Sequence, residues 1–334
     1  MERALNRTGQ RLVLWTFALF FVSLMLVFSP PLASASEEKY PTRPVNVIIA
    51  YSPGGMLDLQ AKLVGDKLGE ILGQPFIRVH KAGAGGTLGA SLAARAEPDG
   101  YTLFVGTSSG LVLSPIVKKL DYKLEDFIPL GIYARGSVFF AVKADAPWKS
   151  LREFVEDAKR RAGEMKVSSF GKLTTAEFVI EEFSKQAGIK LKHVPFKGCS
   201  EAFTALLGGH VDGCFCTTST GQLEAGTIKI LANADYERAK VLPEVKTFKE
   251  LGFDVSLPIW YSLCAPRKTP PRIVEKLSKA MQEVFNRYPE ELREGLRRLE
   301  VSAAFHDSSD SARKFAEDYK TTLRIAKELD VAAK

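Results

Sequence analysis

Hydrophobic and polar positions between residues 45 and 105 change period in a way that predicts alternating strands and helices. Val45–Tyr51 is almost continuously apolar, as in a strand buried on both faces of a parallel sheet. Leu57–Leu72 then carries apolar residues at helical spacing. The alternation continues with a strand at Phe76–His80, a helix at Gly86–Ala96 and a strand at Tyr101–Val105. This β-α-β-α-β order predicts a parallel sheet with right-handed crossovers.

A second α/β set follows Pro147, and a helical tail follows Pro270. The chain of 334 residues suits two lobes of roughly 150 residues each, with a ligand in the cleft between them and the tail bracing the first lobe. The segment Pro243–Pro258 is rich in turn signals and is expected to be a loop. The second set predicts helices at Leu151–Ala162, Thr175–Ala187, Glu201–Leu207 and Ser219–Ala225, strands at Lys166–Ser169, Lys192–Val194, Val211–Cys216 and Ile228–Asn233, and tail helices at Pro271–Asn286, Pro289–Leu299 and Ser309–Leu329.

The first 35 residues have the pattern of a secretory signal peptide. Three arginines precede the uncharged run Leu12–Phe28, and Ala33-Ser34-Ala35 supplies a small-residue cleavage site. An uncleaved membrane anchor is the alternative, because this apolar run is close to the length of a spanning helix. We expect cleavage after Ala35 and a periplasmic mature protein.

Charge and cysteine content exclude some functions without naming one. The formal net charge is +7, and removing three Arg and one Glu with residues 1–35 leaves +5. The remaining charges alternate in sign, as on solvated helix faces and unlike a nucleic-acid-binding stripe. The histidines have no metal-ligand spacing. Cys199, Cys214, Cys216 and Cys264 are most simply small buried residues, and pairing of Cys214 with Cys216, or of Cys199 with Cys264, stays open.

Glycine-rich turns follow each of the first three predicted strands. Ser52–Gly55, Gly83–Gly86 and Gly106–Gly110 all lead toward helix starts, where free backbone N–H groups favour an anion. Together they predict a cradle for a carboxylate or a phosphate. A dinucleotide site is disfavoured, because Leu88 stands where the fingerprint needs its third glycine. Asp58, in the first helical turn, either complements the helix dipole or faces the ligand.

An enzyme is the alternative interpretation of the third turn. Gly106-Thr107-Ser108-Ser109-Gly110 fits the G-x-S-x-G pattern of a hydrolase, with Ser108 as nucleophile and His306-Asp307 downstream. Pro115 interrupts the helix that should follow, and His306 is expected in a polar loop between helices. A secreted serine hydrolase therefore remains the second hypothesis. Trp260 either lines the cleft or packs, and Asp212 either closes a turn or joins the site.

A set of motifs is spread over the mature chain: Tyr40–Pro44, Pro53–Gly55 with Asp58, Gly83–Gly86, Pro98–Thr102, Val194–Gly198, Leu206–Asp212, Leu242–Val245 and Trp260. Together they resemble the Bug-type periplasmic solute receptors of tripartite tricarboxylate transporters, over essentially the whole mature chain. The resemblance implies an α/β, two-lobed type II periplasmic-binding-protein fold, with lobe one at residues 36–142, lobe two at 143–259 and a return to lobe one at 260–334. It also implies a monomer without catalytic residues, cofactor or metal, which binds a small carboxylate and works with integral-membrane transporter subunits. A sensor as the partner stays open.

The resemblance also implies which residues bind the ligand. Three departures from the family pattern, Leu173, Glu177 and Cys199, disfavour a highly charged citrate-like ligand and favour a mono- or dicarboxylate, aromatic or amino-substituted. The implied ligand-binding residues are Tyr51, Ser52, Gly54, Gly55, Asp58, Ala84, Gly85, Thr107 and Ser108 in the first lobe, and Gly171, Thr174, Phe196, Lys197 and Asp212 in the second.

Overall fold

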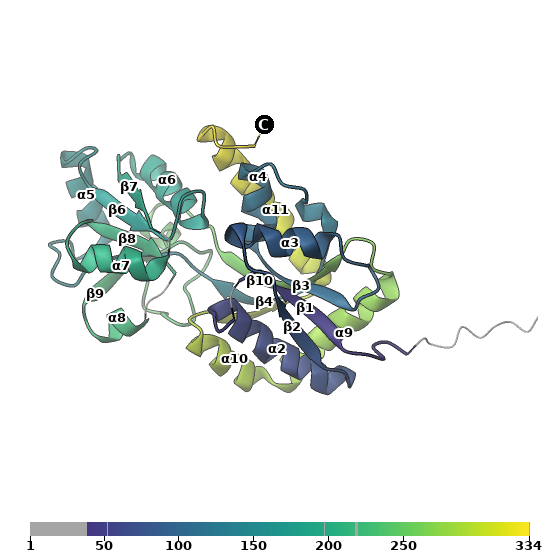
Figure 1. Cartoon of the computed structure of the whole chain (residues 1–334). Helices are drawn as coiled ribbons and strands as arrows, with labels where there is room; N and C mark the ends of the chain where they lie inside the picture. The colour runs from purple at the N-terminus through teal and green to yellow at the C-terminus, as the bar shows by residue number, and fades with distance from the viewer. Residues whose placement is uncertain (1–38, 52, 197, 218–219, 334) are drawn as a thin grey trace, which may run out of the picture. The chain divides into compact units, whose positions relative to one another are not determined.

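The computed structural model describes residues 39–51, 53–196, 198–217 and 220–333 (Figure 1). The expected signal peptide and two expected ligand-binding residues, Ser52 and Lys197, lie outside these ranges. Residues from Pro41 onward form one compact unit, which contains both sheets. Among the described residues, no helix is both long enough and apolar enough to cross a membrane.

The first sheet has six strands in the order β11-β4-β10-β3-β1-β2. Strand β1 pairs in parallel with β2 and with β3, as predicted, with Val45 opposite Phe76 and Asn46 opposite Thr102. The other three strands run antiparallel to their neighbours. The strands are β1 (Val45–Ile49), β2 (Phe76–His80), β3 (Thr102–Thr107), β4 (Phe127–Gly136), β10 (Ile259–Pro266) and β11 (Ser302–His306).

Helices cover both faces of this sheet (Figure 1). One group of helices, α3, α4 and α11, lies above the sheet in the view of Figure 1, and the other, α2, α9 and α10, lies below it. These helices are α2 (Met56–Leu72), α3 (Thr87–Ala94), α4 (Ser114–Val117), α9 (Pro271–Arg287), α10 (Pro289–Arg298) and α11 (Ser308–Glu328).

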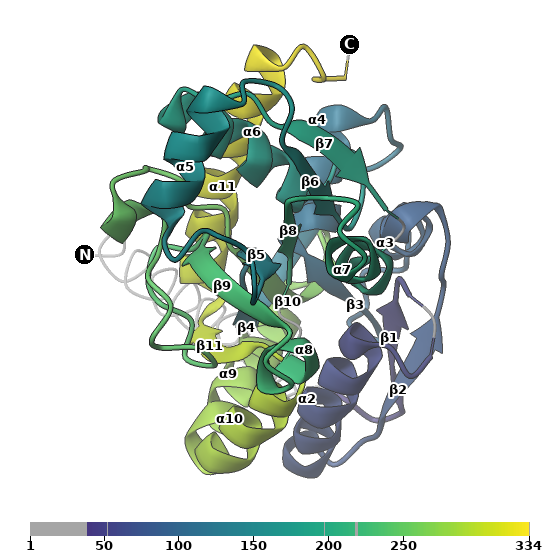
Figure 2. The ribbon, with the colours of Figure 1, turned by 90° about the vertical axis from the view of Figure 1, so that its left-hand side faces the viewer.

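The second sheet has five strands in the order β7-β6-β8-β5-β9. Helix α7 packs on the face that presents Cys214 and Cys216, whereas Phe183 of α6 packs near Phe215 on the other face (Figure 2). Phe140 stacks on Phe215 with ring centroids 4.5 Å apart. The elements are β5 (Phe139–Lys143), β6 (Lys166–Ser169), β7 (Lys192–Pro195), β8 (Gly213–Cys216), β9 (Ile228–Asn233), α5 (Leu151–Arg160), α6 (Thr175–Ala187), α7 (Cys199–Leu207) and α8 (Thr220–Glu224).

The chain crosses between the two sheets twice. Strand β4 continues into β5 through Ser137 and Val138, and the segment 234–258 leads from β9 back to β10. The crossings are hydrogen-bonded to each other, because Ala234 N donates to Val138 O at 2.9 Å. The expected lobe boundary at residue 142 falls inside β5, a strand of the second sheet, whereas the return at residue 260 lies beside the start of β10.

The prediction of secondary structure was right in the parallel units and in the three tail helices, which agree with the predicted bounds within one residue at each end, and it missed four strands. Four elements, β2, β6, β9 and α6, have the predicted bounds. Strands β4, β5, β10 and β11 were not predicted. The tail is therefore not purely helical, and His306 ends a strand instead of lying in a loop between helices.

Candidate functional site

The first two glycine-rich turns touch each other at the carboxyl ends of β1 and β2. A Cβ atom added to Gly86 would lie 3.0 Å from the Tyr51 hydroxyl oxygen, so the Tyr51 ring rests directly on this glycine. Gly86 and Gly54 have positive φ angles of 93° and 77°, which glycine adopts without strain. The second turn also contains Ala84, which begins the short 3-10 helix η1 (Ala84–Gly86). Two of the predicted anion-binding turns thus form one continuous surface.

The Asp58 side chain points into the first lobe and holds the first turn by a hydrogen bond. Its carboxylate accepts from Gly54 N at 2.8 Å, and lies 2.6 Å from Arg78 Nη1 and 2.7 Å from His80 Nε2. The side chain is only 4% exposed. Burial opposes the ionisation of Asp58, but the hydrogen bonds from Gly54, His80 and Arg78 outweigh it and hold the pKa of the carboxyl below its usual value. The oxygens of Asp58 are therefore committed to the protein and hold the first turn in place.

The third turn is tied to the returning chain. Ser108 is buried, and its hydroxyl accepts from Trp260 N at 3.1 Å and donates to Pro258 O at 3.4 Å. Thr107 Oγ1 accepts from Gly110 N at 3.2 Å. His306, the expected base of a hydrolase, instead packs edge-on against Trp260 with ring centroids 5.6 Å apart. Ser108 thus has the contacts of a structural serine and not of a nucleophile.

The second lobe contributes two turns that also touch. Gly171 has φ +150°, and a Cβ atom there would lie 3.0 Å from Thr174 Cγ2 and 3.7 Å from Phe196 O. Thr174 Oγ1 donates to Gly171 O at 2.8 Å, and Phe196 N donates to Ser169 O at 3.0 Å. The turns after β6 and β7 therefore form one unit.

A chain of polar side chains that the sequence did not reveal lies beneath these turns. Glu177 Oε1 is 3.0 Å from His193 Nδ1, and His193 Nε2 is 2.7 Å from Ser169 Oγ. Leu173 N also donates to Glu177. Burial opposes the ionisation of Glu177, but the hydrogen bonds from His193 and Leu173 lower the pKa of this carboxyl below its usual value. Although the order serine, histidine and acid is that of a catalytic triad, Ser169 is fully buried and bonded to the backbone of Gly171.

The two lobes meet where the third turn of the first lobe reaches α6 of the second. Ser109 Oγ lies 2.9 Å from Thr175 Oγ1, the first residue of α6. Ser108, Thr175 and Asp318 contribute to the lining of a cavity of about 20 Å³ beside this contact. Burial raises the pKa of Asp318 to about 7, against the hydrogen bond that it accepts from the Tyr236 hydroxyl. The structure thus brings Thr107 and Ser108 of one lobe close to Thr174 of the other.

Asp212 lies apart from this meeting point, whereas Trp260 adjoins it through the hydrogen bond from its backbone N–H to Ser108. Asp212 Oδ2 accepts from Lys166 N at 2.7 Å, and Asp212 N donates to Lys166 O at 2.8 Å. These contacts place Asp212 at the amino ends of β6 and β8, the edge opposite the turns. Trp260 is 1% exposed, and the charged groups of Arg135 and Lys314 lie 5.8 and 4.9 Å from its ring centroid.

A buried ion pair joins the two crossings. Arg135, near the end of β4, places Nε 3.0 Å from Asp235 Oδ2, just after β9. Ser137 Oγ and Tyr236 N also donate to the Asp235 carboxylate, at 2.8 and 2.7 Å. Asp235 is fully buried and Arg135 nearly so. Any change in the angle between the lobes must accommodate this pair, because it includes residues of both crossings.

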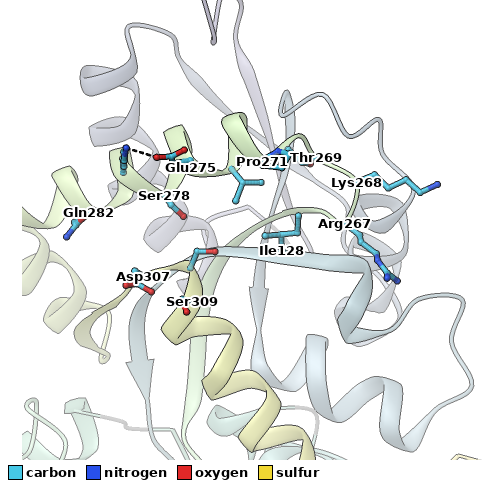
Figure 3. A pocket seen from close by; sticks show the side chains of 13 residues that line it. Ile128, Arg267, Lys268, Thr269, Pro271, Glu275, Ser278, Gln282, Asp307 and Ser309 are labelled. Atoms are coloured by element: carbon cyan, nitrogen blue, oxygen red, sulfur yellow. Dashed lines mark ion pairs between the residues drawn. The ribbon is translucent and has the colours of Figure 1, made fainter. Parts of the chain in front are cut away.

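A separate hollow of about 800 Å³ lies at the other edge of the first sheet (Figure 3). It lies between α9 and the start of α11, and Ile128, Thr269 and Ser308 contribute to its lining. Strand β10 runs antiparallel to β3, with Tyr261 opposite Thr107, so the end of β10 near this hollow is the amino edge of β3. The hollow is therefore distant from the three turns.

Apart from the edge strand β11, the two sheets have the same arrangement of strands. Two crossings join the sheets, and the turns meet at the carboxyl ends of parallel strands. These features define a two-lobed binding protein of the type II class. A family model described as the tripartite tricarboxylate transporter family receptor matches residues 60–331. The chain belongs to this receptor family, which is a family of solute-binding proteins and not of enzymes.

Individual relatives agree with this membership. The chain is 33% identical over 305 residues to a UPF0065 protein from the gbd 5′ region of Cupriavidus necator, covering 90% of this chain and 91% of the relative. It is 30% identical over 263 residues to Protein BugT of Bordetella pertussis, covering 76% and 79%. A ligand-free TctC solute-binding protein from Polaromonas superposes with a TM-score of 0.77 at 28% identity, covering 86% and 99%. MatC from Rhodopseudomonas palustris, with bound malate, superposes with a TM-score of 0.70 at 28% identity, also covering 86% and 99%.

Proposed function

We propose that this protein is an extracytoplasmic receptor that binds a small carboxylate between its lobes and delivers it to a tripartite tricarboxylate-type membrane transporter. The observation that carries the proposal is the Ser109–Thr175 hydrogen bond, which brings turns from both lobes together. Glycine-rich turns and helix starts on both sides of this contact offer backbone N–H groups to an anion. Membership of the receptor family and the malate-bound relative support a carboxylate.

We propose that some of the implied ligand-binding residues contact the ligand and that others do not. Asp58 and Ser108 are committed to internal hydrogen bonds and act by holding the first and third turns, and Asp212 is left out because it lies at the opposite sheet edge. The resemblance adds Ser52 and Lys197. The residues that we propose to contact the ligand in the described part of the chain are Tyr51, Gly54, Gly55, Ala84, Gly85, Thr107, Gly171, Thr174 and Phe196.

Glu177 limits the charge of the ligand. A free N–H in the turn before α6 would suit a second carboxylate, but the N–H of Leu173 already donates to Glu177. The Glu177 carboxylate itself would repel a negative group placed beside it. We therefore propose a ligand whose single strongly bound carboxylate sits on the first-lobe turns, with an uncharged, aromatic or amino-substituted end toward the second lobe.

Lobe closure would convert binding into a signal for the transporter. A ligand shifts the balance between open and closed forms only by its difference in affinity for the two. Because the proposed contacts come from both lobes, most of them exist together only in the closed form. This mechanism breaks no covalent bond and requires no catalytic residue.

The test is a thermal-shift and calorimetry screen of residues 36–334 against monocarboxylates, dicarboxylates, tricarboxylates and amino acids, after removal of co-purified ligand by unfolding and refolding. A ligand at about 100 times its Kd should stabilise the protein by about 2.7 kcal/mol, which is a shift of several degrees. We expect a monocarboxylate or amino acid to give the largest shift. A folded protein that responds to none of these classes would overturn the carboxylate proposal, and a preference for tricarboxylates would overturn the role of Glu177.

A matched pair of glycine variants tests whether the turn after β6 belongs to the ligand site. Gly171→Ala adds a Cβ atom 3.0 Å from Thr174 Cγ2 in the proposed ligand turn, whereas Gly163→Ala adds one in open space; both residues have positive φ angles. Both variants should lose some stability from backbone strain. Only Gly171→Ala should lose ligand affinity, by about tenfold or more if one carboxylate or backbone contact is displaced. Equal affinity in the two variants would remove the β6 turn from the site.

The proposed location follows from residues 1–35. Expression of the full chain in a bacterium, followed by amino-terminal sequencing of the periplasmic fraction, should yield a protein that begins at Ser36. Uptake of the radiolabelled ligand, once it is identified, should then require both this protein and its membrane subunits. Uptake that is unchanged without the protein would contradict delivery to a transporter.

A further inference from the structure

Three of the four cysteines gather in the second lobe, beside the proposed ligand turns. Cys199 is the first residue of α7 and follows the turn after β7, while Cys214 and Cys216 lie on β8. Cys199 is partly exposed, whereas Cys214 and Cys216 are fully buried. All four cysteines are thiols in this structure.

Cys199 lies beside the end of β8 that carries Cys216. Cys199 packs against the apolar cluster that includes Cys214 and Cys216, and its Sγ lies 3.6 Å from Oγ1 of Thr217, the residue after Cys216. A hydrogen bond from the Cys216 thiol, together with Thr217, lowers the pKa of Cys199 despite its partial burial. Burial raises the pKa of Cys216. The start of a nine-residue helix also favours a thiolate at Cys199.

The geometry selects this pair over the other combinations. Cys214 and Cys216 are two positions apart on a strand, which separates their Cα atoms by about 6.6 Å and directs both side chains the same way. A disulfide needs Cβ atoms about 3.5–4.5 Å apart, so this pair would require the strand to distort. Cys264 lies in the first sheet, buried beside Ser262 Oγ at 3.4 Å. Cys199 Sγ lies 3.6 Å from Oγ1 of Thr217, which is one residue from Cys216 and three residues from Cys214. Among the described cysteines, Cys216 therefore has the shorter path to a disulfide with Cys199.

We propose that Cys199 and Cys216 form a reversible disulfide when the protein meets a disulfide oxidant. The Cys199 thiolate attacks one sulfur of the oxidant, forming a mixed disulfide and releasing the other sulfur as a thiolate. Cys216 then loses its proton and attacks Cys199 Sγ, forming the Cys199–Cys216 bond and expelling the second thiolate of the oxidant. The two cysteines lose two electrons and two protons in total, and the oxidant becomes two thiols.

The disulfide would tie the start of α7 to the end of β8 and so restrain the turn that carries Phe196. If the proposed function holds, this turn contacts the ligand, and oxidation should change ligand affinity. That consequence rests on the proposed function, whereas formation of the disulfide does not. Redox state would then act on the second-lobe half of the site.

The experiment treats reduced, folded residues 36–334 with oxidised glutathione, blocks the remaining thiols with iodoacetamide and measures the intact mass. The number of blocked thiols should fall from four to two. Digestion after glutamate cuts the chain after Glu201, which separates Cys199 from Cys214 and Cys216, so the bond should appear as a linked peptide pair that dithiothreitol separates. Four blocked thiols after oxidation would overturn the proposal, as would a linkage that forms only in urea.

Cysteine variants identify the partner. Cys214→Ser and Cys264→Ser should keep the disulfide, whereas Cys216→Ala should leave Cys199 as a stable mixed disulfide with glutathione. A bond retained in Cys216→Ala would assign the partner to Cys214 and overturn this pairing. The disulfide is mapped in the wild-type protein, so the pairing can be tested even if a variant fails to fold. Thermal shifts of the reduced protein with ligand test the proposed function separately, so the two can fail independently.

Discussion

Asp318 should make the protein less stable as the pH rises from 4 to 7, the reverse of the usual effect of a carboxyl group. Its folded pKa is about 7, because α11 buries it near Tyr236 and Ser108 at the lobe contact. An unfolded aspartate has a pKa of about 3.9. Between these pH values the folded protein keeps a proton that the unfolded chain has lost, so the free energy of unfolding falls by up to about 1.4 kcal/mol for each pH unit. Above the folded pKa the loss stops growing.

The variant Asp318→Asn removes this titration while keeping nearly the same shape. The asparagine oxygen can still accept from the Tyr236 hydroxyl, which lies 3.3 Å from Asp318 Oδ1. Wild type and variant should be similarly stable near pH 4.5, and the variant should be more stable at pH 8, by at most about 4 kcal/mol over three pH units. Urea unfolding at pH 4.5, 6, 7 and 8 measures the difference, and all other titrating groups cancel between the two proteins.

Glu328→Gln on the same helix is the control. Glu328 is exposed and its pKa is lowered, first by a hydrogen bond from Lys185, so it stays ionised from pH 6 to 8. The stability difference that Glu328→Gln causes should therefore be constant over these pH values. A constant difference for Asp318→Asn as well would refute the reasoning, because it would show that the Asp318 carboxyl does not change protonation in the folded protein.

Three further predictions concern the supports of the two lobes. Gly89→Ala should cost about 1–3 kcal/mol in urea unfolding, because its Cβ would lie 2.9 Å from Ala50, whereas Gly221→Ala, with open space around it, should cost nothing. Asp58→Asn should cost about 1–3 kcal/mol at pH 7 and progressively less as the pH falls through the lowered folded pKa of Asp58, and an equal cost at pH 7 and pH 3 would contradict this. Asp235→Ala should cost about 3–5 kcal/mol, because the buried Arg135 loses its buried partner and keeps Glu237, whose side chain is exposed. Combining it with Arg135→Met should recover part of that loss, and strict additivity would argue against coupling.

The parallel units of the fold were predictable because each is local in sequence. A buried strand such as Val45–Ile49 is followed within a few residues by its helix, and the change of hydrophobic period marks the boundary. Of the missed strands, β4 and β11 have no such marker. Strand β4 contains Pro129 and two glycines, and β11 is a run of five residues that is a strand because it pairs with β4. Their conformation depends on partners far away in the sequence.

The candidate site was predictable in its turns and not in the direction of its side chains. Three glycine-rich turns after parallel strands must share one sheet edge, and the structure places the described turn residues there. Asp58 turns inward because Arg78 and His80 of the next strand meet it, and Glu177 is drawn to His193 in the same way. Neither pairing follows from sequence spacing, because each joins elements whose register is set only by the folded sheet.

The position of β10 has a consequence for how the chain folds. Strand β10 lies between β3 and β4 in the middle of the first sheet, although more than 120 residues separate it from β4 in the sequence. A chain that emerges amino end first therefore exposes two unpaired strand edges until the whole second lobe has followed. The second lobe can complete its sheet from residues 139–233 alone. We expect the later lobe to fold first and the earlier lobe to wait for it, so the amino-terminal half exposes its unpaired strand edges for longest.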